Sequence, residues 1–121
     1  MDDADFIEFD SMITQHRELA AGRWRQLSFV EQMANVGSEI ERVISWKTRG
    51  RPDIGSRAFD RELELLDLTI ADVANRRRLK ELVRVREALA DFFVFDNEYN
   101  STQESWQRYF RFFLNAARGN R

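Results

Sequence analysis

Residues 28–47, SFVEQMANVGSEIERVISWK, decide the fold, because their pattern predicts one long amphipathic helix. The apolar residues of this stretch recur at alternating spacings of four and three, at Phe29, Met33, Val36, Ile40 and Val43. Neighbouring apolar residues widen this stripe, so the helix needs packing partners on two sides. We therefore expect it to be the central helix of a bundle.

Two further features describe this central helix. Ser28 followed three residues later by Glu31 is a capping box, in which each side chain bonds a backbone N–H that the first helical turn leaves free. Gly37 lies on the apolar face, where a glycine costs about 1 kcal/mol relative to alanine. We expect this cost to be offset by another helix that crosses closely at Gly37.

The segments on either side of the central helix also have helical patterns. Residues 4–20 carry a thinner apolar stripe, and Gly22 is the expected stop of this peripheral helix. The break at residues 48–52 contains Gly and Pro, and Asp53 or Ser56 is the expected cap of the next helix. That helix should have a solvated polar side formed by Arg57, Asp60, Arg61, Glu62 and Glu64.

The remaining chain predicts two more helices. The helix that follows the break at residues 48–52 should end near Asp72. A short connection then leads to a helix whose apolar side lies within residues 79–93. Ser101 and Glu104 form a second predicted capping box, at the start of the last helix. The predicted fold class is all-α, an up-down bundle of four main helices plus a peripheral N-terminal helix.

Composition and charge limit the possible functions. The 121 residues suit one domain and contain no Cys, which excludes disulfides, zinc–thiolate sites and iron–sulfur clusters. The single His16 is too little for a di-iron site or a His-based zinc site, so we expect no cofactor and no metal. His16 itself is interpreted as an ordinary surface residue.

The charge is unevenly distributed along the chain. Residues 1–22 carry six acidic residues and one basic residue, a charge of −5, while the remainder carries +3. We therefore divide the chain into an acidic N-terminal extension, 1–23, and a helical bundle domain, 24–121. No basic leader and no apolar run of about 20 residues is present, so a cytoplasmic protein without a membrane span is expected.

Basic side chains recur along two of the predicted helices. They would form adjacent stripes able to meet phosphates, although acidic residues interrupt the field. The candidate nucleic-acid-binding residues are Arg76, Arg77, Lys80, Arg84, Arg108, Arg111 and Arg118.

Acidic residues are further candidates, for a structural ion pair or for a metal site. Asp67 lies in the run LLDLTI and is expected to form a structural ion pair with Arg84 or Arg86. Glu39, Glu64 and Asp67 would be the acids of a magnesium-dependent nucleotide pyrophosphohydrolase, because magnesium prefers carboxylate and water oxygens. Solvated acids that pair with neighbouring arginines are the favoured interpretation.

Aromatic residues cover more than one face of the last two helices. The runs FFVF at 92–95 and YFRFFL at 109–114 need covering either by this chain or by another one. We expect a self-associating or partner-binding surface near Phe95 and Phe112, with burial under the first helix as the alternative.

Several phrases of the sequence resemble a family of small all-helical prokaryotic proteins with no assigned activity. They are WxxLSxxEQxANVGSEIER at 24–42, LELLDLTIAD at 63–72, RLKELxRxRE at 78–87 and WxxYF at 106–110. The resemblance implies a compact unit over residues 24–121 and supplies no catalytic residue.

The leading hypothesis is a non-enzymatic helical-bundle interaction protein, an oligomeric accessory subunit of another protein. The alternative is an RNA- or DNA-binding accessory module that uses its arginine-rich helix faces. Small bundles of this size include accessory proteins of reverse transcriptases, which is an analogy of fold only.

Overall fold

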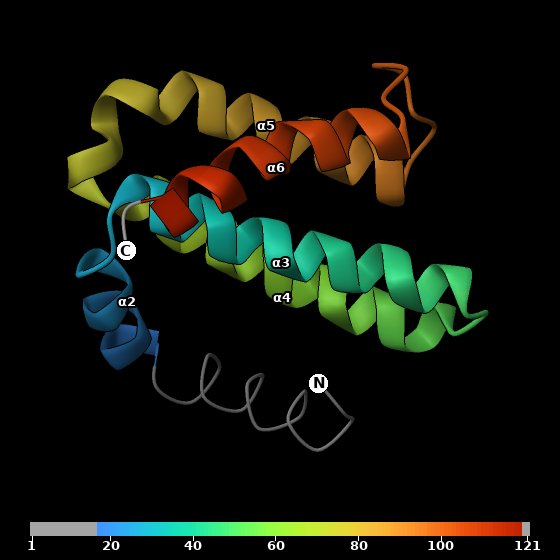
Figure 1. Ribbon diagram of the computed structural model, residues 1–121, viewed down its shortest axis with the longest axis horizontal. Helices are drawn as coiled ribbons and strands as arrows, with labels where there is room; N and C mark the ends of the chain where they lie inside the picture. Colours follow the sequence, from blue (N-terminus) through green and yellow to red (C-terminus); the bar gives the residue numbers. More distant parts are fainter. Residues whose placement is uncertain (1–16, 120–121) are drawn as a thin grey trace.

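The computed structural model describes residues 17–119, which are all-α as predicted and contain no strand (Figure 1). The described elements are α2 (Arg17–Arg25), α3 (Phe29–Thr48), α4 (Pro52–Ala71), the 3-10 helix η1 (Val73–Arg78), α5 (Leu79–Phe93) and α6 (Gln103–Gly119). His16 and most of the predicted first helix lie outside the described residues. No helix within 17–119 has both the length and the apolar character that crossing a membrane requires.

The central helix of the fold is α3, as its two-sided apolar stripe predicts. It packs chiefly against α4 and α6, and α4 lies beside it in the opposite direction (Figure 1). Helix α5 packs on α4, and α2 also contacts α4. The fully buried side chains of this core include Met33, Ile40, Leu66, Leu82, Leu89 and Phe110.

Helix α6 crosses α3 closely at Gly37. A Cβ atom placed on Gly37 would lie only 2.8 Å from Cβ of Phe110. Because Cβ is fixed close to the backbone, the two helices could not keep this separation if residue 37 had a side chain. The predicted close crossing at Gly37 is confirmed.

The N-terminus of α3 is capped as predicted. The Ser28 hydroxyl accepts a hydrogen bond from the Glu31 amide, and the Glu31 carboxylate accepts one from the Ser28 amide, both at 3.1 Å. Just before this cap, Trp24 is buried and its indole N–H donates to the Thr69 hydroxyl at 2.9 Å. The entry into α3 is therefore fixed to α4 as well as to its own first turn.

Two other predicted helix boundaries are wrong. Gly22 does not end a helix, because α2 continues through it to Arg25. Helix α4 begins at Pro52, whose fixed φ suits the first helical position, and neither Asp53 nor Ser56 is its cap.

The second capping box lies one residue later than predicted. Thr102 and Ser105 exchange hydrogen bonds between side chain and backbone amide, at 3.0 Å in each direction. Ser101 instead donates its amide N–H to the side chain of Asn97 in the preceding loop. The predicted pair Ser101 and Glu104 is thus replaced by a pair with the same spacing and chemistry.

Two charged residues expected on the solvated side of α4 are buried. Arg61 is 1% exposed and Glu62 is 0% exposed. The Arg61 Nη2 atom lies 2.9 Å from Oε2 of Glu39 on α3, and Arg42 bonds the other oxygen of the same carboxylate. Helix α4 contacts α2, α3, α5 and η1, so its buried side is wider than its apolar stripe and includes these two charged positions.

A second buried polar cluster joins α2, α3 and η1. The Gln32 amide nitrogen donates to the Trp24 carbonyl and to the Asp72 carboxylate, both at 2.9 Å. The Gln32 amide oxygen accepts from Asn75 at 2.8 Å. Because both hydrogens and the oxygen of the amide are used, this cluster fixes one arrangement of the three elements.

Candidate interaction site between α5 and α6

A groove lies between α5 and α6, because α5 packs on α4 whereas α6 packs on α3. It consists of two adjoining cavities of about 460 and 380 Å3 that share Glu81, Ser105 and Tyr109. We call it the α5–α6 groove and define it by Glu81, Arg84, Ser105, Arg108, Tyr109 and Phe112.

Aromatic side chains of α6 form one wall of the α5–α6 groove. Phe112 is 67% exposed and meets the buried Phe113 edge-on, with ring centroids 5.2 Å apart. Tyr109 contacts the same Phe113 ring at a centroid distance of 5.5 Å. Phe112 is therefore an exposed aromatic side chain on a firmly packed base.

A polar bridge crosses the groove. The Tyr109 hydroxyl donates a 2.9 Å hydrogen bond to Oε1 of Glu81 on α5. Burial of the phenol, together with this hydrogen bond to a carboxylate, raises the pKa of Tyr109 well above its usual range. The phenol thus stays protonated and ties the two helices together.

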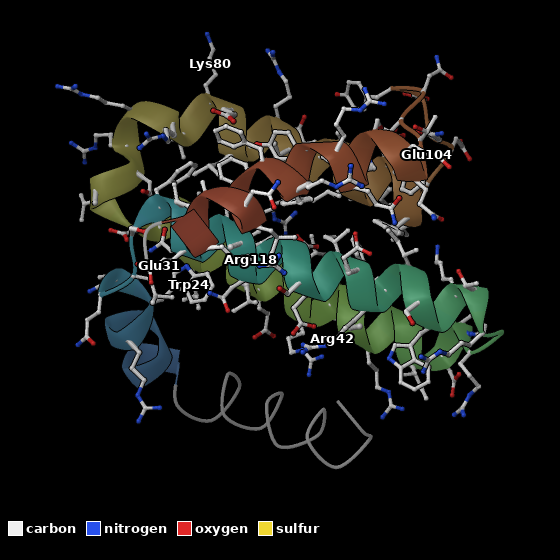
Figure 2. The ribbon with its side chains drawn as sticks, in the orientation of Figure 1. Trp24, Glu31, Arg42, Lys80, Glu104 and Arg118 are labelled. Atoms are coloured by element: carbon white, nitrogen blue, oxygen red, sulfur yellow. The ribbon has the colours of Figure 1, made fainter. Side chains whose placement is uncertain are left out.

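The seven basic candidates are all exposed, and their side chains form no hydrogen bond or ion pair with any described residue. Arg84 and Arg108 line the α5–α6 groove, from α5 and α6 respectively. Arg76 and Arg77 lie on η1, and Lys80 points away from the helices in Figure 2. The structure therefore brings two of the seven cations into one groove.

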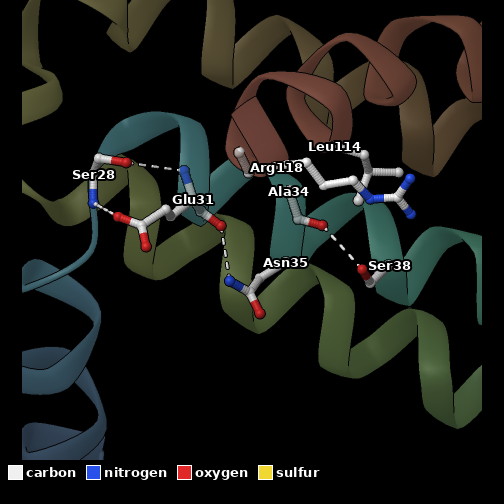
Figure 3. A pocket seen from close by; sticks show the side chains of 8 residues that line it. Ser28, Glu31, Ala34, Asn35, Ser38, Leu114 and Arg118 are labelled. Carbon is white, nitrogen blue, oxygen red and sulfur yellow. Dashed lines mark hydrogen bonds between the residues drawn. The ribbon is translucent and has the colours of Figure 1, made fainter. Parts of the chain in front are cut away.

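Arg118 lines a different cavity, of about 610 Å3, between α3 and α6 (Figure 3). The α3 side chains in it bond within their own helix: Asn35 donates to the Glu31 carbonyl at 2.8 Å, and Ser38 donates to the Ala34 carbonyl at 3.1 Å. Arg108 and Arg118 thus belong to separate surfaces, although the sequence places them on one stripe.

The two aromatic candidates also lie apart. Phe112 lies beside Glu81 near the start of α5, whereas Phe95 follows the end of that helix and is 72% exposed. A helix of the length of α5 spans about 22 Å. Phe95 and Phe112 are therefore two exposed sites at opposite ends of α5.

Asp67 pairs with Arg86 rather than with Arg84. The distance from Arg86 Nε to Asp67 Oδ1 is 2.7 Å, and the side chains are 39% and 54% exposed. The hydrogen bond to Asp67 raises the pKa of Arg86. An exposed ion pair of this kind contributes about 0–1 kcal/mol to stability, so the pair is not a buried interaction that holds α4 and α5 together.

The acids considered for magnesium have other partners. Glu39 is held by Arg61 and Arg42, and Asp67 by Arg86. Within residues 17–119 no group of three or more Asp, Glu or His side chains is placed to hold a metal ion.

The buried carboxyl of Glu62 is the main feature that sequence reasoning missed. Neither of its oxygens has a hydrogen-bond partner in the described part of the chain. Burial raises the pKa of this carboxyl well above its usual value; the charge of Arg86 opposes this rise. Its spacing could have revealed it, because Glu62 lies one turn after Ala58 and one turn before Leu66, both of which are buried.

No family model matches the chain, and neither a curated protein nor a solved structure matches it. The family resemblance therefore rests on the sequence phrases alone.

Proposed function

We propose that the chain is a non-enzymatic interaction protein, an accessory subunit that binds a partner protein in the α5–α6 groove. In this proposal α3 to α6 act as an up-down bundle that supports the groove. The observation that carries it is the exposed ring of Phe112 in the same groove as Arg84 and Arg108, whose side chains pair with no residue in the described part of the chain. An exposed aromatic anchor beside arginines is typical of protein interfaces.

The chemistry of the groove selects its partner. Phe112 and Tyr109 need an apolar side chain to cover them, and Arg84 and Arg108 favour carboxylates. Glu81 is engaged by the Tyr109 hydroxyl, which reduces its repulsion of an acidic partner. We therefore infer a protein segment that presents apolar and acidic side chains together, as an amphipathic helix does.

Binding of RNA or DNA is the second candidate. It is favoured by the seven exposed cations, none of which has a partner within the described residues. These cations are spread over η1, α5 and two faces of α6, whereas the aromatic anchor is confined to the groove. The groove therefore supports a protein partner better than a phosphate backbone.

A random-peptide display library selected on the purified chain tests the proposal without knowledge of the natural partner. Phe112→Asp serves as the counter-target, and Val73→Asp serves as a matched control, because Val73 is an equally exposed apolar residue outside the groove. We expect enriched peptides that combine apolar and acidic residues and bind the native chain and Val73→Asp but not Phe112→Asp.

Two results would overturn the proposal. One is a set of peptides that binds Phe112→Asp as well as the native chain. The other is binding of a mixed RNA and DNA oligonucleotide pool that weakens with salt and is lost in Arg84→Glu/Arg108→Glu, with no groove-dependent peptide. The second result would favour the nucleic-acid alternative.

A further inference from the structure

The loop between α5 and α6 is held firmly by one buried carboxylate. Asp91 is 8% exposed, and its two oxygens accept hydrogen bonds from the amides of Glu98 at 2.8 Å and Tyr99 at 3.0 Å. The Asp91 carbonyl accepts a third, from the Asn97 amide at 3.1 Å. A carboxylate that bonds two successive amides fixes the path of the loop.

Two asparagines complete this loop. Asn97 and Asn100 have φ of 54° and 55°, in the left-handed region that asparagine tolerates better than most residues. The Asn97 side chain donates to the Ser101 carbonyl and accepts from the Ser101 amide, at 3.0 and 2.9 Å. Residues 94–102 therefore have one well-defined conformation.

This ordered loop presents aromatic and acidic side chains to solvent. Phe95 is 72% exposed and Tyr99 is 59% exposed. Asp96 and Glu98 lie between them in sequence and are also exposed. Rigid aromatic residues in a fixed loop are effective binding elements, because little conformational entropy is lost when they are covered. We call residues 94–102 the aromatic–acidic loop.

The aromatic–acidic loop has the chemistry that the α5–α6 groove selects. The loop offers two aromatic rings and two carboxylates, and the groove offers two aromatic rings and two guanidinium groups that have no ion-pair partner among residues 17–119. The groove's exposed anchor, Phe112, lies beside Glu81 near the start of α5, whereas the loop follows the end of that helix, so the anchor and the loop lie at opposite ends of the α5–α6 pair.

We propose that the occupant of the α5–α6 groove is the aromatic–acidic loop of a second copy of this chain. A two-fold, antiparallel pairing of the α5–α6 faces brings the loop of each copy to the groove of the other. This inference rests on the proposed function of the groove and names its partner.

A charge exchange tests this pairing by light scattering after size-exclusion chromatography. The loop variant is Asp96→Lys/Glu98→Lys, and the groove variant is Arg84→Glu/Arg108→Glu. We expect the native chain to be dimeric at micromolar concentrations, and each variant alone to dissociate about tenfold more readily or further.

An equimolar mixture of the two variants should form a dimer again, because in the mixed pair both loop–groove contacts carry opposite charges. Asp53→Lys/Asp60→Lys is the matched control, since both residues are exposed on α4, and it should remain dimeric. Circular dichroism of each variant checks that the helices are intact.

A monomeric native chain, or a mixture of variants that stays monomeric, overturns the second-copy inference. Dimers that are insensitive to both charge reversals overturn it as well. The proposed function survives these results if display peptides still bind in a Phe112-dependent manner, because those peptides test the groove without requiring a second copy. The two failures are therefore distinguishable.

Discussion

Replacing Glu62 by Gln should remove a pH dependence that this carboxyl imposes on the stability of the fold. Glu62 is 0% exposed, and neither oxygen has a hydrogen-bond partner within residues 17–119. Burial disfavours its charged form, while Asp67 and Glu39 add negative charge nearby and Arg86 compensates in part. The pKa of the folded carboxyl therefore lies well above its ordinary value of 4.5.

The sign of the effect follows from proton binding. Between 4.5 and the raised pKa, the folded chain keeps the Glu62 proton and the unfolded chain has lost it. The stabilisation is therefore fully present below the unfolded pKa and is lost as the pH rises through the folded pKa. One proton gives a slope of at most about 1.4 kcal/mol per pH unit in the free energy of unfolding.

Urea unfolding followed by circular dichroism at several pH values between about 5 and about 8 measures this slope. Glu62→Gln keeps the shape of the side chain and removes its titration. The free energy of unfolding should therefore fall more steeply with rising pH in the native chain than in the variant. Glu62→Leu also removes the unpaired polar atoms and should add about 1–3 kcal/mol at neutral pH. Asp60→Asn, on the exposed side of α4, is the control. Equal slopes in the native chain and Glu62→Gln would refute this reasoning.

Three further predictions concern the core and the groove. Arg61→Met should lower the free energy of unfolding by about 3–5 kcal/mol, because the buried Glu39 carboxylate loses one of its partners. The double variant Arg61→Met/Glu39→Leu should recover most of this loss, as measured by urea unfolding. Gly37→Ala should lower the free energy of unfolding by about 1–3 kcal/mol, although alanine has the better helix propensity, because the new Cβ would meet Phe110. The exposed Gly22→Ala is the control and should leave the free energy of unfolding unchanged or raise it by up to about 1 kcal/mol. Equal effects of the two substitutions on thermal unfolding would contradict the close crossing. In an absorbance titration of the folded chain, the Tyr109 phenol should ionise at a pH well above the ordinary tyrosine pKa of about 10. In denaturant its pKa should return toward the ordinary value. Loss of this late transition in Tyr109→Phe would assign the transition to Tyr109.

Local sequence signals predicted the features of this fold that depend on local geometry. The reciprocal bonds of Ser28 and Glu31 involve atoms within one helical turn, so their spacing is enough to predict them. Gly37 was informative because a glycine on an apolar helix face loses stability unless another helix uses the space. The cap of α6 was displaced by one residue because Ser101, Thr102 and Ser105 offer competing hydroxyl groups.

Features that depend on how the helices are rotated against each other were not predictable from one sequence. Arg61 was assigned to solvent because it is charged, but α4 has neighbours on several sides, which bury it. Glu62 was assigned to solvent for the same reason, although its spacing between Ala58 and Leu66 did indicate the buried face. The candidate site shows the same limit. Arg108 and Arg118 share a loose stripe in sequence, and the docking of α6 on α3 directs them to different cavities.

The arrangement of α5 links the buried carboxyl to the groove. Helix α5 forms one wall of the groove and packs on α4, the helix that carries Glu62. Arg86, on α5, supplies the positive charge near that carboxyl. If the docking of α5 contributes to the burial of Glu62, ionisation of this carboxyl raises the free energy of the state in which α5 covers α4.

A ligand that bridges both walls of the groove favours the state in which α5 is in place, so on this premise its binding is coupled to the protonation of Glu62. Peptides selected on the groove should consequently bind more weakly as the pH rises through the folded pKa of Glu62. The dependence should be smaller in Glu62→Gln, as measured by fluorescence anisotropy. An equal pH dependence in both chains would show that α5 holds its position on α4 whatever the charge of Glu62.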